Sequence, residues 1–145
     1  MGKAFKDNQV LSGSWAQVWF DGELLAECSA INAKITEGRE DVQMGIDVGS
    51  KLISLKGEGS ITVHHVYTTK VNLVKSKIKG KDPRVQIIAK IDDPDAVGGQ
   101  VERWSFKDCC VTETVLFDWK NGAKAEKTIP FTFPPTKMQL LDSIV

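Results

Sequence analysis

The stretch LISLKGEGSITVH, Leu52 to His64, decides the fold because apolar or glycine residues alternate with polar ones from Ile53 onward. Alternation with a period of two is typical of a β-strand. At roughly 3.3 Å per residue the stretch would span about 43 Å. A globular chain of 145 residues has a diameter of only about 38 Å. The strand is therefore predicted to project beyond its own core.

A projecting strand carries main-chain N–H and C=O groups that need partners. Folded proteins leave few such groups unpaired, and an open strand edge promotes pairing with other chains. The outer part of this strand is therefore expected to find backbone partners on another molecule, because the alternative is an aggregation-prone edge. We predict that the chain assembles with copies of itself.

The residues before this strand contain a predicted hairpin. Residues 1–12 are interpreted as a flexible N-terminal arm, and Ser14 to Phe20 alternates like a strand. Asp21-Gly22 is a strong signal for a tight hairpin turn. The return strand is expected to begin at Glu23 and to continue through Ile31, Ala33 and Ile35.

Residues 31–64 are predicted to form one extended β-arm with a mobile tip. The apolar positions shift in parity after Gly38, to Val42 and Met44. Such a shift predicts a bulge or break near Gly38. The loop at the tip is predicted from Gly45, Asp47, Gly49 and Ser50.

One helix is predicted over residues 67–79. Its apolar stripe, at helical spacing, consists of Tyr67, Val71, Val74 and Ile78. Gly80 is a typical stop signal, and Pro83 follows three residues later. A single stripe predicts a helix on the outside of a sheet.

The second half of the chain is predicted to contain strands only. These are Val85 to Ile91, Val101 to Val111, Thr114 to Trp119 and Lys127 to Phe133, with a hairpin turn at Asn121-Gly122 and the end of the sheet at Pro134-Pro135. The pattern lacks alternation of strands with helices, which favours a mainly β sandwich or partly closed barrel over a parallel sheet. Residues 13–145 are predicted to form a single domain.

Composition excludes several classes of protein. Nineteen basic and nineteen acidic residues give a formal net charge of zero, which argues against a nucleic-acid binder that neutralises phosphates. No apolar run approaches the ~18 residues of a membrane span, and Met1 to Asp7 does not resemble a signal peptide, so no membrane anchoring is expected. The three cysteines are predicted to be reduced thiols that fill core space.

The candidate chemistry is weak. His64 and His65 are neighbours in a strand, so their rings diverge and cannot share a metal. Asp92, Asp93 and Asp95 lack the spacing of a calcium loop and are better explained as a turn whose aspartates cap backbone amides. We predict no catalytic residue, no cofactor and no metal site. An enzyme using Asp93, Asp95 and His64 is the least favoured alternative.

Several short motifs follow one another between residues 10 and 133. They are LSGSW at 11–15 with WFDGE at 19–23, KGEGSIT at 56–62, VY at 66–67, DDPD at 92–95 with Gly98 and ER at 102–103, and IPFTF at 129–133. In this order they resemble the tail tube protein family of contractile-tailed phages, PBSX-like defective prophages and phage-tail-like bacteriocins. Each motif is short, and their shared order carries the resemblance.

The resemblance implies an architecture and a function. Two packed sheets would form a barrel-like sandwich with one flanking α-helix and a long β-arm. Copies would close into hexameric rings that stack into the inner tail tube, a channel for DNA passage or envelope puncture. The implied partners are sheath, baseplate and tape-measure proteins, with DNA as non-specific cargo. The implied location is a virion tail or tail-like particle, assembled in the bacterial cytoplasm; such a protein is not an enzyme.

The predicted arm gives two hypotheses about residues. We expect part of the arm to pack on a neighbouring subunit through Gly38, Val42, Met44, Gly45, Asp47 and Gly49. We expect some polar residues to face the channel, from the set Glu37, Lys56, Glu58, Ser60 and Thr62. The main alternative is a small β-barrel module that binds a ligand or nucleic acid through the basic residues Lys75, Lys77, Lys79, Lys81 and Arg84 near the helix end.

Overall fold

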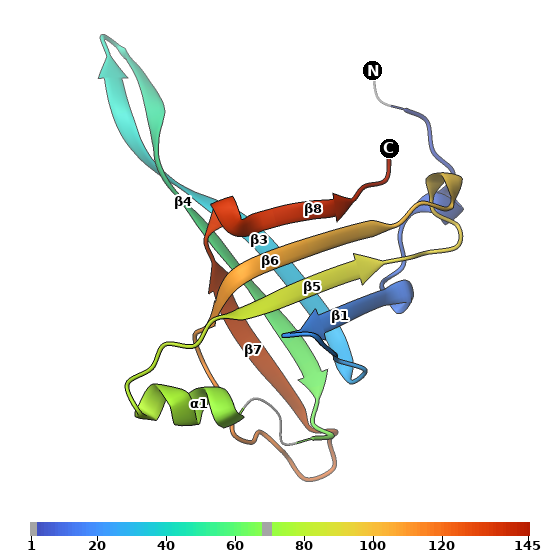
Figure 1. The fold of residues 1–145 in the computed structure, drawn as a ribbon. Helices are drawn as coiled ribbons and strands as arrows, with labels where there is room; N and C mark the ends of the chain where they lie inside the picture. The colour runs from blue at the N-terminus through green and yellow to red at the C-terminus, as the bar shows by residue number, and fades with distance from the viewer. Residues whose placement is uncertain (1–2, 68–70) are drawn as a thin grey trace.

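The computed structural model describes residues 3–67 and 71–145, which are dominated by antiparallel strands (Figure 1). The described strands are β1 (Ala16–Phe20), β2 (Glu23–Leu24), β3 (Cys28–Met44), β4 (Asp47–His64), β5 (Val85–Ile91), β6 (Glu102–Val111), β7 (Glu126–Phe133) and β8 (Met138–Asp142). The helix α1 spans Val71–Ile78, and short 3-10 turns lie at Asp7–Gln9, Gly13–Trp15, Val97–Gly99 and Pro135–Lys137.

The strands form two layers that share β6. One layer has the order β2-β1-β5-β6, with β8 paired to the other side of β6, and the second layer has the order β7-β4-β3. The far end of β6 pairs with β7 through Cys110↔Thr132 and Val111↔Phe131, so one strand connects both layers (Figure 1). The predicted mainly β sandwich with one helix is confirmed. Among the described strands, β2 and β3 end the strand order, and no pairing closes a barrel between them.

The core lies between the layers and is built by strand alternation. Inward positions are mostly apolar and almost fully buried, with Ser105 and Lys127 as buried polar exceptions, while their neighbours along each strand are more exposed. The Phe106 and Phe133 rings, from different layers, lie with centroids 4.7 Å apart. The core side chains include Val18, Phe20, Ile61, Val63, Ile87, Phe106, Val111, Phe131 and Phe133.

The first hairpin forms where the sequence predicts it. Asp21 and Gly22 both have positive φ, 53° and 87°, as a two-residue type I′ turn requires. The predicted return strand is wrong in its continuity, however. β2 ends at Leu24, and the chain then crosses to the other layer before β3 begins at Cys28. Apolar residues lie on both sides of this crossing, so the local sequence contains no signal that the chain changes layer here.

Two predictions for the C-terminal half are wrong. Residues 112–125 form a loop in place of a strand at Thr114 to Trp119. A turn does form at Asn121-Gly122, where Gly122 has φ 79°, but it lies within that loop and does not connect two strands. Pro134-Pro135 ends only β7, because a 3-10 turn redirects the chain into β8, which pairs with β6.

Helix α1 is confirmed, but its packing face is different from the predicted stripe. Ile78 is 80% exposed, whereas Leu73 packs against the core and Lys77 Nζ donates a hydrogen bond to the Val111 carbonyl. The predicted start at Tyr67 is wrong, since Tyr67 lies in a bend, and the predicted helical residues 68–70 lie outside the described residues. Among the described residues, each helix is too short or too polar to span a membrane.

The aspartate-rich turn after β5 is hydrogen-bonded to the segment that precedes β1. Asp93 is only 5% exposed. Its two carboxylate oxygens accept hydrogen bonds from the Ser12 and Asp95 amides, both at 2.9 Å. The aspartate therefore caps backbone amides, as predicted, although it is buried and not solvated. The predicted flexible arm of residues 1–12 is held at Ser12 by this contact.

Candidate functional site

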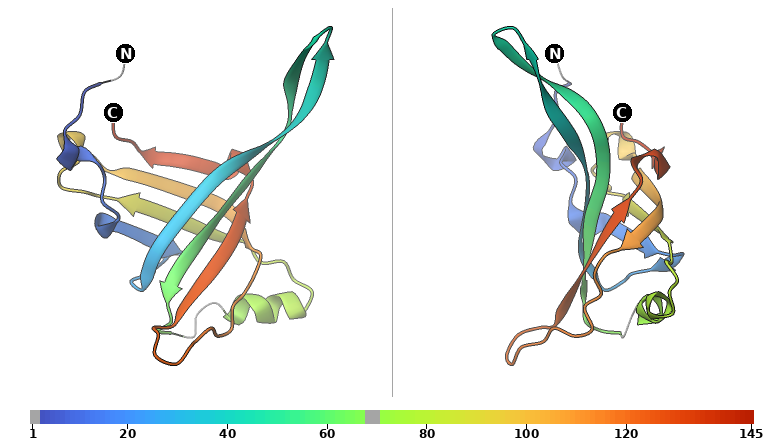
Figure 2. Two further views of the ribbon diagram at one scale, coloured as in Figure 1. Left: turned by 180° about the vertical axis from the view of Figure 1, so that it is seen from behind. Right: turned by 90° about the vertical axis from the view of Figure 1, so that its left-hand side faces the viewer.

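The longest feature of the molecule is the hairpin of β3 and β4. The two strands pair from Cys28↔Val63 to Met44↔Asp47, and the connecting turn is Gly45-Ile46. β7 pairs with β4 only from Gly57 to His64. Residues 36–56, hereafter the distal arm, therefore extend past β7 as a two-stranded ribbon (Figure 2).

The distal arm confirms the predicted projection and corrects two details. Its strands satisfy each other's inner hydrogen bonds, so only their outer edges remain for another molecule. The tip loop is shorter than predicted, because Asp47, Gly49 and Ser50 belong to β4. The predicted break near Gly38 is confirmed: the register shifts between Gly38↔Ser54 and Arg39↔Leu52.

One face of the hairpin is polar. Cross-strand partners point to the same side of a sheet, so the pairs Asn32↔Ser60, Lys34↔Glu58 and Thr36↔Lys56 share a face. Asn32 Nδ2 donates to Ser60 Oγ at 2.9 Å, and Thr36 Oγ1 donates to Glu58 Oε1 at 3.2 Å. Lys34 Nζ lies 3.7 Å from the same Glu58 oxygen. These contacts pair the Glu58 carboxylate with Lys34, one of the two lysines on this face.

This face unites four of the five residues predicted to line a channel, namely Lys56, Glu58, Ser60 and Thr62. Glu37 lies on the opposite face, because it pairs with Leu55. There Arg39 Nε donates to Glu37 Oε2 at 3.0 Å. This hydrogen bond and the charge of Arg39 lower the pKa of the Glu37 carboxyl. The strand register, which the sequence does not show, separates Glu37 from the other four.

The distal arm also exposes many large apolar side chains. Ile46 at the tip is 100% exposed. Met44 lies over Gly49, where an added Cβ would come within 2.9 Å of Met44 Cε. The arm contains all six residues predicted for a subunit interface, Gly38, Val42, Met44, Gly45, Asp47 and Gly49. Sequence reasoning missed its other exposed apolar residues, Ile46, Val48, Leu52, Ile53 and Leu55, although their position in a projecting strand was a usable signal.

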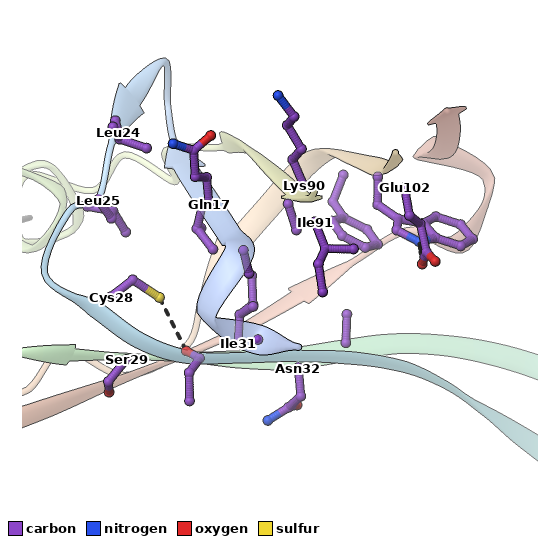
Figure 3. Close-up of a pocket in the computed structure, with 18 of the residues that line it drawn as sticks. Gln17, Leu24, Leu25, Cys28, Ser29, Ile31, Asn32, Lys90, Ile91 and Glu102 are labelled. Atoms are coloured by element: carbon purple, nitrogen blue, oxygen red, sulfur yellow. Dashed lines mark hydrogen bonds between the residues drawn. The ribbon is translucent and has the colours of Figure 1, made fainter. Parts of the chain in front are cut away.

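A second feature is an apolar cleft between the two layers, on the side where they do not pair. Its volume is about 960 Å³. Figure 3 shows Leu25, Ile31 and Ile91 lining it from different elements, with Lys90 and Glu102 among its few charged residues. Cys28 also lines it, and burial raises the pKa of this thiol. Sequence reasoning missed the cleft, because it forms between strands that are distant in the chain.

The residues of the enzyme alternative are engaged elsewhere. Asp93 caps the backbone as described, and His64 Nδ1 lies 3.6 Å from Glu126 Oε1. His65 packs edge-on against Trp119, with ring centroids 6.0 Å apart. Residues 3–67 and 71–145 contain no group of three or more His, Cys, Asp or Glu side chains that could hold a metal ion.

Comparison with known proteins agrees with this architecture. A protein from Bacillus subtilis strain 168, the phage-like element PBSX protein XkdM, is 28% identical over 134 residues, covering 90% of each chain. A chain of the sheath–tube complex of an extracellular contractile injection system superimposes with a TM-score of 0.66 at 9% identity, covering 98% of this chain and 100% of that one. A chain of a gene transfer agent virion gives 0.56 at 12% identity, covering 91% and 98%. The family model described as phage tail tube protein matches residues 3–140, and the chain therefore belongs to the phage tail tube protein family.

Proposed function

We propose that this tail tube subunit closes into hexameric rings that stack into the inner tube of a contractile phage tail or tail-like particle. The observation that carries the proposal is the distal arm, which leaves its own domain with exposed apolar side chains. A two-stranded ribbon is marginally stable alone in water, and exposed apolar patches typically mark interaction sites. A neighbouring copy would bury the arm, and a closed ring would remove the open strand edges.

The open cleft supports the same proposal. It leaves apolar walls in contact with water on the unpaired side of the sandwich, which favours association of the subunit. The polar face that carries Lys56, Glu58, Ser60 and Thr62 suits a channel wall. Its mixed charges would let DNA pass without the tight, salt-dependent binding that a basic surface produces. In this proposal DNA is cargo, and no reaction is catalysed.

The implied partners and location follow from the relatives. One structural neighbour is part of a sheath–tube complex and another belongs to a baseplate. We infer a corresponding sheath outside the tube and a baseplate at its end, with a tape-measure protein inside. Assembly would take place in the bacterial cytoplasm.

The main test shortens the distal arm without disturbing its register. Deletion of residues 43–50 together with Val42→Gly joins Glu40 and Lys51, which already pair, through a two-residue Asp-Gly turn of the favoured hairpin type. The shortened subunit should show the circular dichroism and thermal unfolding of the parent but form no rings or tubes in electron microscopy. Full-length protein with Val42→Gly alone is the matched control. Tubes of normal length from the shortened subunit would refute the proposal.

Thiol labelling tests the channel wall separately. Ser60→Cys should react with a bulky maleimide in the unassembled subunit and resist it in assembled tubes. Lys107→Cys, an exposed position on the other layer, is the control for labelling outside the channel. Equal labelling of Ser60→Cys before and after assembly would contradict the assignment. Salt-dependent nucleic-acid binding by a stable monomer would instead favour the alternative binding module.

A further inference from the structure

We propose that rings stack head to tail through an apolar contact between the tip of one subunit's distal arm and an aromatic cluster at the opposite end of a second copy. This inference rests on the proposed function and names the surface that receives the arm. The receiving surface, hereafter the basal cluster, consists of Val66, Tyr67, Leu116, Phe117 and Trp119.

The basal cluster is an exposed apolar surface that the subunit itself does not cover. Its five side chains are each 60–64% exposed. The Phe117 and Trp119 rings stack with centroids 4.8 Å apart, and Trp119 meets the edge of His65. The His65 amide donates to the Ala125 carbonyl at 2.9 Å, which ties the segment after β4 to the loop before β7. Aromatic residues grouped in this way are typical anchors of protein interfaces.

The arm tip and the basal cluster lie at opposite ends of one sheet. β4 begins at Asp47 beside the tip and ends at His64 beside the basal cluster. Figures 1 and 2 show the tip at one extreme of the molecule and the loop of residues 112–125 at the other. At roughly 3.3 Å per residue, this strand separates the two by about 59 Å. A subunit therefore cannot place its tip on its own basal cluster, but a copy shifted along the sheet can receive it.

Two different patches at opposite ends produce a heterologous contact, which repeats without closing. The contact therefore extends along the tube axis, whereas ring closure occurs around that axis. Each subunit would offer one tip and one basal cluster, so a ring would present the same surface after every addition. This geometry accounts for a polymer that grows by whole rings.

The charges of the two ends are complementary. The outer part of the distal arm, residues 37–51, carries four carboxylates, Glu37, Glu40, Asp41 and Asp47, against two cations, Arg39 and Lys51, and the third cation, Lys56, lies at the base of the arm. Helix α1 lies at the same end of the molecule as the basal cluster (Figure 1). The helix and the turn after it carry five cations, Lys75, Lys77, Lys79, Lys81 and Arg84, against the single carboxylate Asp82. Opposite charges steer and orient an encounter, so an acidic arm approaches this end more readily than another arm.

Photocrosslinking tests the contact directly. Benzoylphenylalanine replaces Ile46, whose full exposure means that the substitution disturbs no packing within the subunit. Tubes are assembled from equal amounts of isotopically light and heavy subunits, irradiated, digested and examined by mass spectrometry. We expect light–heavy adducts between position 46 and peptides containing residues 114–120 or 64–67. The same probe at Val97, an exposed apolar residue outside the arm, should give no such adducts.

The outcomes distinguish this inference from the proposed function. Tubes whose adducts map to the cleft or to another surface overturn the inference and leave the tube proposal intact. Failure of the unmodified protein to form any rings or tubes overturns both.

A charge exchange provides a second, independent test. Ile46→Glu and Phe117→Lys should each lower the mass of polymer at a fixed protein concentration by at least about tenfold, because each places a charge in the apolar contact. The double variant should recover most of the polymer, because the new charges face each other. Val97→Glu should assemble like the parent. A double variant that assembles no better than the worse single variant would overturn the contact.

Discussion

Gly59 is one of two glycines, with Gly57, whose lack of a side chain lets β4 pack closely between its neighbours. A Cβ atom there would overlap the Asn32 carbonyl oxygen and lie 2.7 Å from Phe131 Cζ and 3.0 Å from Ala33 Cα. Two of these atoms belong to the backbone of β3 and cannot move independently. We predict that Gly59→Ala lowers the free energy of unfolding by about 1–3 kcal/mol, measured by urea denaturation of the unassembled subunit.

Gly13 is the matched control for this substitution. A Cβ atom at Gly13 would have no neighbour within 4 Å, so Gly13→Ala should change the free energy of unfolding by no more than about 0.5 kcal/mol. Equal effects of the two substitutions would show that crowding at Gly59 does not limit stability.

Cys109 gives a prediction about pH at the same scale. Burial raises the pKa of its thiol to about 11, against about 8.5 in an unfolded chain. The folded state therefore holds this proton more tightly, and the resulting stabilisation is present below about pH 8.5 and is lost as the pH rises towards 11. At about pH 9, iodoacetamide should modify Cys109 in denaturant but hardly at all in the folded protein, as measured by mass spectrometry. Prompt modification of the folded protein would contradict the burial of this thiol.

Helix α1 illustrates how one element is fixed by its packing face. Leu73 contacts the core, whereas Ile78, which the predicted stripe placed on the packed face, is exposed to solvent. Leu73→Ala should therefore lower the free energy of unfolding by about 1–2 kcal/mol, less than the 2–5 kcal/mol typical of fully buried leucines. Ile78→Ala should change it by no more than about 0.5 kcal/mol. Thermal unfolding of the two variants measures the difference. A larger loss of stability in Ile78→Ala than in Leu73→Ala would show that the predicted stripe is the packed face.

The whole subunit leaves three apolar surfaces open to water, the cleft, the distal arm and the basal cluster. An apolar fluorescent dye such as anilinonaphthalene sulfonate should therefore bind the folded, unassembled subunit. The arm-shortened variant should retain most of this fluorescence, because its cleft of about 960 Å³ is unchanged. Ala33→Glu, which places a carboxylate in the lining of the cleft, should reduce it. Fluorescence that disappears with the arm would assign dye binding to the arm.

Features that depend on neighbouring residues were predictable from the sequence alone. Strict alternation identified the projecting strand, because strand periodicity is a local property. Asp21-Gly22 identified the first turn, since few residue pairs adopt positive φ easily. The parity change after Gly38 identified the bulge, because an extra residue in a strand shifts the apolar positions by one. The order of the short motifs identified the tail tube family.

The tertiary structure alone decided which face of each element is covered, because the covering residues come from distant parts of the chain. Leu116, Phe117 and Trp119 resemble a strand locally but lie in a loop that pairs with none of the described strands. β8 forms beyond two prolines because β6 offers it an edge. The register of β3 against β4 places Glu37 on one face and Lys56 on the other. Sequence periodicity determines that successive side chains point to opposite faces of a strand. Packing determines which residues each face contacts.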